Sequence, residues 1–164
     1  MLKLFGTVMI ISAFGIWGVS KSEKLKRRCD SLSLMISSLT LLENEIDYSQ
    51  KDIAAALMSV GIIRNFPLFI NAAKGIYKTT VQQAFGDAVK SSGICLAKSD
   101  REILTEFSQS LGTLEKDSQI GNIRHTKALF AAAKTSACED YEKYGRLYRN
   151  MGFLLGILVS VLLF

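Results

Sequence analysis

Two uncharged apolar runs lie near the ends of the sequence and constrain its fold more than any other feature. The first is residues 4–19 (LFGTVMIISAFGIWGV), and the second is residues 151–164 (MGFLLGILVSVLLF). Each is shorter than the roughly 20 residues that a helix needs to cross about 30 Å of hydrocarbon. Lys3 and Arg149 have long side chains that can extend toward water, which lengthens the segment that lipid can accommodate. The sequence therefore predicts two short transmembrane helices.

Each run also has a second interpretation. The carboxyl-terminal run could be a core helix, although its one clearly polar side chain, Ser160, gives it little of the polar face that such helices keep. The amino-terminal run could be a secretory signal, with Gly18 and Ser20 as small residues at a cleavage site.

A basic cluster just after the first run argues against export of the residues that follow it. The cluster consists of Lys21, Lys24, Lys26, Arg27 and Arg28. Such a cluster resists translocation, which predicts that residues 21–150 are cytoplasmic. Attraction to anionic lipid headgroups is the expected role of these five side chains.

Charge and cysteine usage fit the same compartment. The formal net charge of the 164 residues is +5, and the basic density is local, so no nucleic-acid partner is expected. The three cysteines, Cys29, Cys95 and Cys138, are widely spaced and form no metal or redox motif. The sequence predicts that they are reduced structural thiols.

Helical periodicity fills the residues between the two runs. Apolar residues spaced by three and four, from Leu25 to Ile46, predict a helix that continues from the first run to about Tyr48. A last long helix is expected to open near Asp117 and to continue into the second run. Four shorter helices are predicted between them, with these capping residues in chain order: Asp52, Asn65, Thr79 or Thr80, and Ser99.

Finer signals mark the ends of the short helices. Gly61 and Gly112 are expected to end the first and the fourth of them. Pro67 is expected in the first turn of the second, and Ser99 with Glu102 has the spacing of a capping box.

The predicted fold class is all-α, an antiparallel bundle of about six helices. Its first and last helices extend into the terminal spans. The predicted domains are a transmembrane segment at residues 1–20, a cytoplasmic helical domain at residues 21–147 and a second transmembrane segment at residues 148–164.

The chain contains no recognisable catalytic, cofactor or metal motif. His125 is the single histidine of the sequence, which argues against a metal site or a Cys-His pair. Glu43 and Glu45 are two positions apart on a helix and therefore point to different faces. We expect a protein that is not an enzyme and needs no cofactor.

A strip of small residues marks the second apolar run. Gly152, Gly156 and Ser160 recur every four residues, which lets another helix approach closely. The approaching helix could be the first run, where Gly6 and Ala13 offer a matching strip. It could also belong to another protein, including a second copy of this chain.

Several segments, taken in order, resemble the stage III sporulation protein AB family of spore-forming bacteria. They are the opening MLKLFG, the run LTLLENEIDY at residues 39–48, the stretch from Phe107 to Ile123 and the closing RNMGFLLGILVSVLLF. Asp52 and Ala55 depart from the family pattern, which has a proline and an acid in this turn.

The resemblance implies similarity to the helical domain of type II secretion and type IV pilus platform proteins. It implies a place in the mother-cell membrane around the forespore, within the channel complex that joins the two cells. The implied partners are the cytoplasmic ATPase of the same operon, stage III sporulation protein AA, and other membrane components of the channel.

The same analogy predicts which residues contact the ATPase. They are Glu43, Glu45, Tyr48 and Asp52, at the expected tip of the helical domain. Glu43 and Glu45 could equally do no more than solvate the first long helix. The alternative function is a membrane-anchored regulatory or signalling adaptor that binds a soluble partner.

Overall fold

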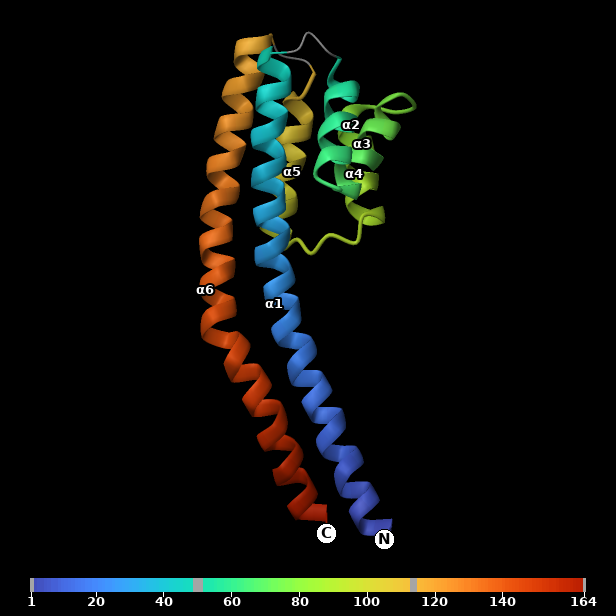
Figure 1. Cartoon of the computed structure of the whole chain (residues 1–164), viewed down its shortest axis with the longest axis vertical. Helices are drawn as coiled ribbons and strands as arrows, with labels where there is room; N and C mark the ends of the chain where they lie inside the picture. Colours follow the sequence, from blue (N-terminus) through green and yellow to red (C-terminus); the bar gives the residue numbers. More distant parts are fainter. Residues whose placement is uncertain (1, 49–51, 113–114, 164) are drawn as a thin grey trace. The chain divides into compact units, whose positions relative to one another are not determined.

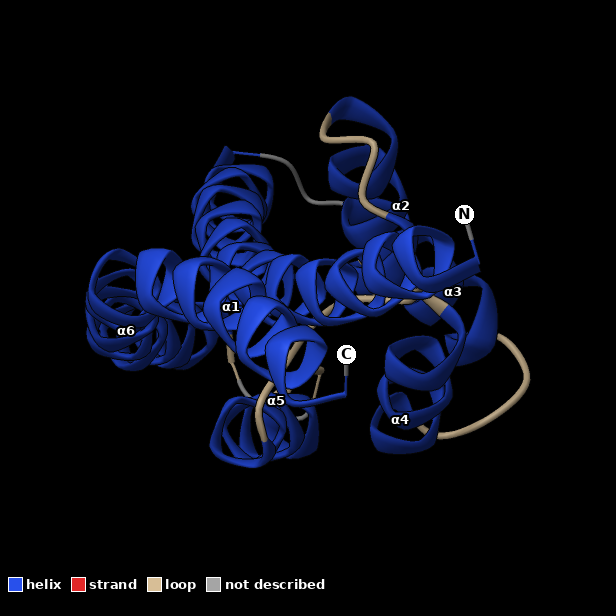
Figure 2. Ribbon diagram, turned by 90° about the horizontal axis from the view of Figure 1, so that it is seen from below, coloured by secondary structure: helices blue, strands red, loops and turns tan. Residues whose placement is uncertain are grey.

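The computed structural model of the chain describes residues 2–48, 52–112 and 115–163. These residues form helices and the connections between them, with no strand (Figures 1 and 2). The helices are α1 (Leu2–Tyr48), α2 (Ile53–Ile63), α3 (Pro67–Ile76), α4 (Val81–Ser91), α5 (Lys98–Ser110) and α6 (Lys116–Leu163). The structure confirms the predicted all-α fold, in which the first and last helices of the chain are long and the four between them are short.

The chain divides into two compact units. Unit 1 consists of Met1–Cys29 and Thr135–Phe164, and unit 2 consists of Asp30–Lys134. Unit 1 is therefore made from one part of α1 and one part of α6, whereas unit 2 holds the rest of both helices and all of α2 to α5.

Both apolar runs are helical, but the two predicted transmembrane spans are not supported. Over the residues that the structure describes, no helix combines enough length with enough apolar character to cross a membrane. The uncharged runs are sixteen and fourteen residues long, and charged residues such as Lys21 and Arg149 stand beside them. The prediction relied on the long side chains of Lys3 and Arg149 to extend the runs, and the described helices do not reach the apolar length that a span requires.

The α1 part of unit 2 presents the apolar stripe that the sequence predicts. Its members are fully buried: Leu32, Met35, Leu39 and Leu42. They are spaced by three and four residues, so they lie on one face of the helix. Burial of this face is the main stabilising contribution of α1 to unit 2.

An aromatic chain joins the short helices of unit 2. Phe66 lies 5.0 Å from Phe69, Phe69 lies 6.2 Å from Phe85, and Phe85 lies 6.0 Å from Phe107, measured between ring centroids. The second and third pairs meet edge to face, the geometry that the ring quadrupole favours. All four rings are buried, so this chain is a central part of the unit 2 core.

The turn between α2 and α3 differs from the prediction. α2 does not end at Gly61 but continues to Ile63. Gly61 instead lets α3 approach closely, because a Cβ atom there would lie 2.7 Å from Ile70 Cγ1. Phe66 caps α3 in place of Asn65, which has a φ of 48°. Burial of the Phe66 ring holds the chain at this position. Pro67 occupies the first turn of α3, as predicted.

The predicted N-terminal cap is confirmed for α4 and wrong for α5. The Thr80 hydroxyl accepts a hydrogen bond of 3.4 Å from the backbone N–H of Gln83, as expected of a capping residue. α5 is capped at Ala97 and not at Ser99, because the buried Asp100 carboxylate accepts a bond of 2.8 Å from the Ala97 N–H. Gly112, with a φ of 88°, follows the end of α5 as predicted.

Cys29 of α1 and Cys138 of α6 form a disulfide in unit 1, with their Cα atoms 5.2 Å apart. The prediction of three reduced thiols is therefore wrong for this pair. The two residues are 109 positions apart in the sequence, and the antiparallel pairing of α1 with α6 makes them neighbours. Cys95 lies outside the disulfide.

Candidate functional site

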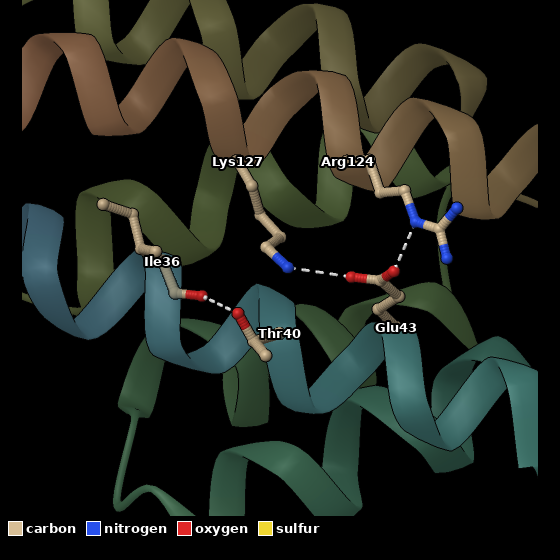
Figure 3. A network of polar contacts seen from close by, with 5 residues as sticks. All are labelled: Ile36, Thr40, Glu43, Arg124 and Lys127. Atoms are coloured by element: carbon tan, nitrogen blue, oxygen red, sulfur yellow. Dashed lines mark hydrogen bonds and ion pairs between the residues drawn. The ribbon is translucent and has the colours of Figure 1, made fainter.

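Glu43 of α1 is held by two cationic side chains from α6 (Figure 3). Arg124 Nε donates a hydrogen bond of 2.6 Å to Glu43 Oε1, and Lys127 Nζ donates one of 2.8 Å to Oε2. Lys127 and Arg124 both lower the pKa of the Glu43 carboxyl, and Glu43 in turn raises the pKa of Arg124. With only 13% of its side chain exposed, Glu43 is occupied within unit 2.

The next acidic residues along α1 are also engaged. The Ser59 hydroxyl of α2 donates to Glu45 Oε1 at 3.4 Å. Lys116, at the start of α6, lies 3.3 Å from Asp47 Oδ1 and also donates to the Asp47 backbone carbonyl. The end of α1 is thereby tied to both α2 and α6.

Tyr48 and Asp52 differ from the two glutamates. The Tyr48 side chain is 88% exposed at the last residue of α1. Asp52 is exposed at the N-cap of α2, and its side chain makes no capping hydrogen bond. Of the four residues predicted to contact an ATPase, Tyr48 and Asp52 present their side chains to solvent, whereas Glu43 and Glu45 bind other helices of unit 2.

The small residues of α6 lie against α1 of the same chain in unit 1. A Cβ atom at Gly152 would lie 2.6 Å from the Phe14 carbonyl oxygen, and one at Gly156 would lie 3.0 Å from Ile11 Cα. Ser160, the third member of the strip, is 5% exposed. The main chains of α1 and α6 are therefore in direct contact at Gly152 and Gly156.

The α1 side of this contact is not the strip that the sequence suggested. Gly18 faces Gly152, and a Cβ atom at Gly18 would lie 2.5 Å from the Tyr148 carbonyl oxygen. Ala13, one of the two residues expected there, is exposed. The spacing of small residues gave no information on how α1 is rotated, so Gly18 was not singled out.

The basic cluster of unit 1 is exposed at most of its positions. Lys21 Nζ lies 5.8 Å from the centroid of the Trp17 ring, within the range of a cation–π interaction. Arg27 forms an exposed ion pair of 3.1 Å with Glu23. The cluster therefore presents most of its charge to solvent.

Most of the large apolar side chains that the structure leaves exposed belong to unit 1. Examples are Met9, Ile16, Leu154 and Leu162, which are 65% to 78% exposed. The exposed large apolar side chains are therefore concentrated in unit 1.

Two residues that sequence reasoning missed are Arg124 and Lys127. Their spacing of three on α6 placed them on one face, which was the available signal. Nothing in the sequence indicated that Glu43, more than eighty residues earlier, would lie opposite them. Within the described residues, no group of three or more His, Cys, Asp and Glu side chains is arranged to hold a metal ion.

The comparisons with known proteins agree over the length of the chain. The chain is 24% identical over 172 residues to stage III sporulation protein AB of Bacillus subtilis (strain 168), with 99% of each protein covered. Its fold is similar to a solved structure of stage III sporulation protein AB (SpoIIIAB), with a TM-score of 0.60 and 20% identity, over 70% of this chain and 96% of that one. The family model of stage III sporulation protein AB matches residues 3–164. The chain therefore belongs to the stage III sporulation protein AB family.

Proposed function

We propose that this protein is a non-enzymatic platform component of the channel complex between mother cell and forespore. Unit 2 binds the cytoplasmic ATPase of the same operon, and unit 1 attaches the protein to the mother-cell membrane around the forespore. The observation that carries this proposal is the family match, which extends over residues 3–164. Other membrane components of the channel are expected as further partners, and self-association is one form that such contacts can take.

The structure of unit 2 suits a docking platform. Ion pairs and hydrogen bonds from α2 and α6 fix the end of α1, so the exposed Tyr48 ring projects from a constrained helix. An exposed tyrosine on a constrained helix offers a large contact area and has few rotatable bonds to fix on binding, which makes it an effective contact residue. In this proposal Tyr48 and Asp52 contact the ATPase, whereas Glu43 and Glu45 position them.

Unit 1 suits attachment to lipid. Its exposed apolar side chains gain free energy when they leave water, by about 25 cal/mol for each Å² that is buried. The neighbouring basic cluster adds roughly 1 kcal/mol for each lysine or arginine near an anionic surface. Both contributions favour a membrane as the surface that unit 1 meets.

Binding of the full-length chain to the purified operon ATPase tests the proposal. The double variant Tyr48→Ala/Asp52→Ala should weaken that binding at least severalfold. Tyr77→Ala is the matched control, because Tyr77 is also exposed in unit 2, at 71%, but follows α3. If the double variant and Tyr77→Ala bound the ATPase with equal affinity, the contact would lie elsewhere than at Tyr48 and Asp52. Failure of the chain to bind the ATPase, combined with binding to an unrelated regulator, would favour the adaptor function instead.

A further inference from the structure

A cavity of about 540 Å³ opens between α1 and α6 in unit 1. It is lined by Ser22, Tyr141, Glu142, Gly145, Arg146 and Arg149. Five of these residues belong to α6, and Ser22 is the contribution of α1. No function derived above uses this cavity.

Gly145 leaves the inner wall of the cavity open. A Cβ atom at this position would lie 2.9 Å from Tyr141 Cδ2 and 3.2 Å from the Ser22 hydroxyl oxygen. A glycine inside a helix costs about 0.5–1 kcal/mol relative to alanine. Here the missing side chain keeps both hydroxyl-bearing residues next to the cavity.

The lining groups favour an anion. The lining carries two guanidinium groups, of Arg146 and Arg149, and one carboxylate, of Glu142. Within the described part of the chain, neither guanidinium forms an ion pair. A guanidinium group binds phosphate oxygens through two parallel N–H bonds, and the hydroxyls of Ser22 and Tyr141 can donate further bonds.

The face of α6 that carries the arginines continues as an apolar stripe. Arg146, Arg149, Phe153 and Ile157 are spaced by three and four residues, so they lie along one side of the helix. The Phe153 and Ile157 side chains are each 49% exposed. A ligand with a phosphate at one end and hydrocarbon at the other matches this order of charged and apolar groups.

We propose that this cavity binds the phosphodiester of an anionic phospholipid headgroup, with the acyl chains along Phe153 and Ile157. This inference rests on the proposed attachment of unit 1 to a membrane. It differs from general attraction by the basic cluster at residues 21–28, because it assigns a defined pocket with paired guanidinium groups.

The test measures how tightly phosphatidylglycerol binds the full-length chain in nanodiscs of phosphatidylcholine. Native mass spectrometry gives the number of phosphatidylglycerol molecules retained per chain as their fraction is varied. Arg146→Gln/Arg149→Gln should weaken retention roughly tenfold, because two charge-assisted contacts are lost. Lys74→Gln/Lys78→Gln removes the same charge from exposed positions of unit 2, outside both the cavity and the basic cluster, and should change retention no more than about twofold. If the two double variants lost phosphatidylglycerol retention equally, retention would depend only on net charge, and the proposed pocket would be wrong.

Three further measurements make the outcome specific. Arg149→Lys keeps the charge but loses the paired N–H groups, so retention should still fall, and unchanged retention would contradict the pocket. Inorganic phosphate should not displace the lipid; displacement at concentrations similar to those of the headgroup would mean a free-anion site. Quenching of Trp17 fluorescence by brominated lipid should persist in the glutamine variants. If the unmodified chain shows no quenching, the proposed membrane attachment has failed, which is distinct from failure of the pocket.

Discussion

Arg124 of α6 donates its 2.6 Å hydrogen bond to Glu43, a residue of α1 that lies 81 positions earlier in the chain. Lys127, one turn further along α6, binds the other oxygen of the same carboxylate. The two contacts fix the rotation of α1 relative to α6 within unit 2. The glutamate is therefore a structural residue whose charge the fold itself compensates.

Glu43→Gln should reduce the stability of unit 2 in a pH-dependent way. Because the pKa of Glu43 is lowered in the folded chain, its carboxylate contributes stability above the pKa of an unfolded glutamate, and this contribution is lost as the pH falls through the lowered pKa. The free energy of unfolding should fall by about 1 kcal/mol at neutral pH, and the difference from wild type should vanish in acid. Urea titrations of the variant and the wild-type protein over a pH series measure this difference in the free energy of unfolding. Glu102→Gln, which removes an exposed pair with Lys98, should show no comparable effect.

Two glycines of unit 2 should respond in opposite directions to alanine. No atom lies within 4 Å of a Cβ at Gly86, so Gly86→Ala should raise the free energy of unfolding by about 0.5–1 kcal/mol through helix propensity. At Gly61 the new Cβ would lie 2.7 Å from Ile70 Cγ1 and 2.9 Å from the Ile70 backbone nitrogen. Gly61→Ala should therefore destabilise α2 against α3. Thermal unfolding compares the two variants, and stabilisation by both would contradict the observed packing.

Cys138→Ser should remove a covalent link between the two long helices. The link closes a loop of about a hundred residues, for which loss of a disulfide costs about 2–4 kcal/mol. Alkylation under denaturing, non-reducing conditions followed by mass measurement should label one cysteine in the wild-type chain and two in the variant. Labelling of all three cysteines in the oxidised wild-type protein would contradict the pairing. Cys95→Ser is the control that leaves the disulfide intact.

Gly152→Ala should weaken the helix pair of unit 1. The added Cβ would lie 2.6 Å from the Phe14 carbonyl oxygen, so α1 and α6 would have to move apart. Gly121→Ala, on the same helix, adds a Cβ with no atom within 4 Å and should leave the protein as stable or more so. Circular dichroism during heating in lipid nanodiscs compares them. An unchanged or higher midpoint for Gly152→Ala would mean that the close approach at Gly152 is unimportant.

Trp17 is the single tryptophan of the chain and reports on the environment of unit 1. Its ring is 48% exposed beside Lys21, so contact with lipid should shift its emission to shorter wavelength. Vesicles of brominated phospholipid should quench the emission, because the ring would lie within contact range of the bromine atoms. The variant Trp17→Phe, which has no tryptophan, gives the background emission. Emission that is identical with and without vesicles would contradict membrane attachment through this unit.

The sequence predicted those features that depend on local patterns. The spacing of Leu32, Met35, Leu39 and Leu42 fixes the buried face of α1, because periodicity within one helix determines which residues share a side. The expected cap at Thr79 or Thr80 rested on a similarly local signal, and the bond of Thr80 reaches only to Gln83. The helix order followed from such signals.

Features that depend on contacts between distant residues were not predictable in the same way. Asn65 is a better capping residue than Phe66, yet burial of the Phe66 ring decides where α3 begins. The partners of Glu43 and the pairing of Cys29 with Cys138 depend on how α1 and α6 are rotated and aligned, which one sequence does not specify. The sequence therefore did not predict which of the four proposed contact residues are exposed and which bind other helices of unit 2.

The contact between Gly18 and Gly152 also determines the register of the two helices in unit 1. Because main-chain atoms approach closely at this point, a slip of α1 by one turn would bring Phe14 or Ser22 to the place where only a glycine fits. Apolar side chains alone would tolerate several alignments, since one leucine can replace another against a neighbouring helix. The glycine pair removes that freedom, so a push or pull on one helix of unit 1 is transmitted to the other without sliding.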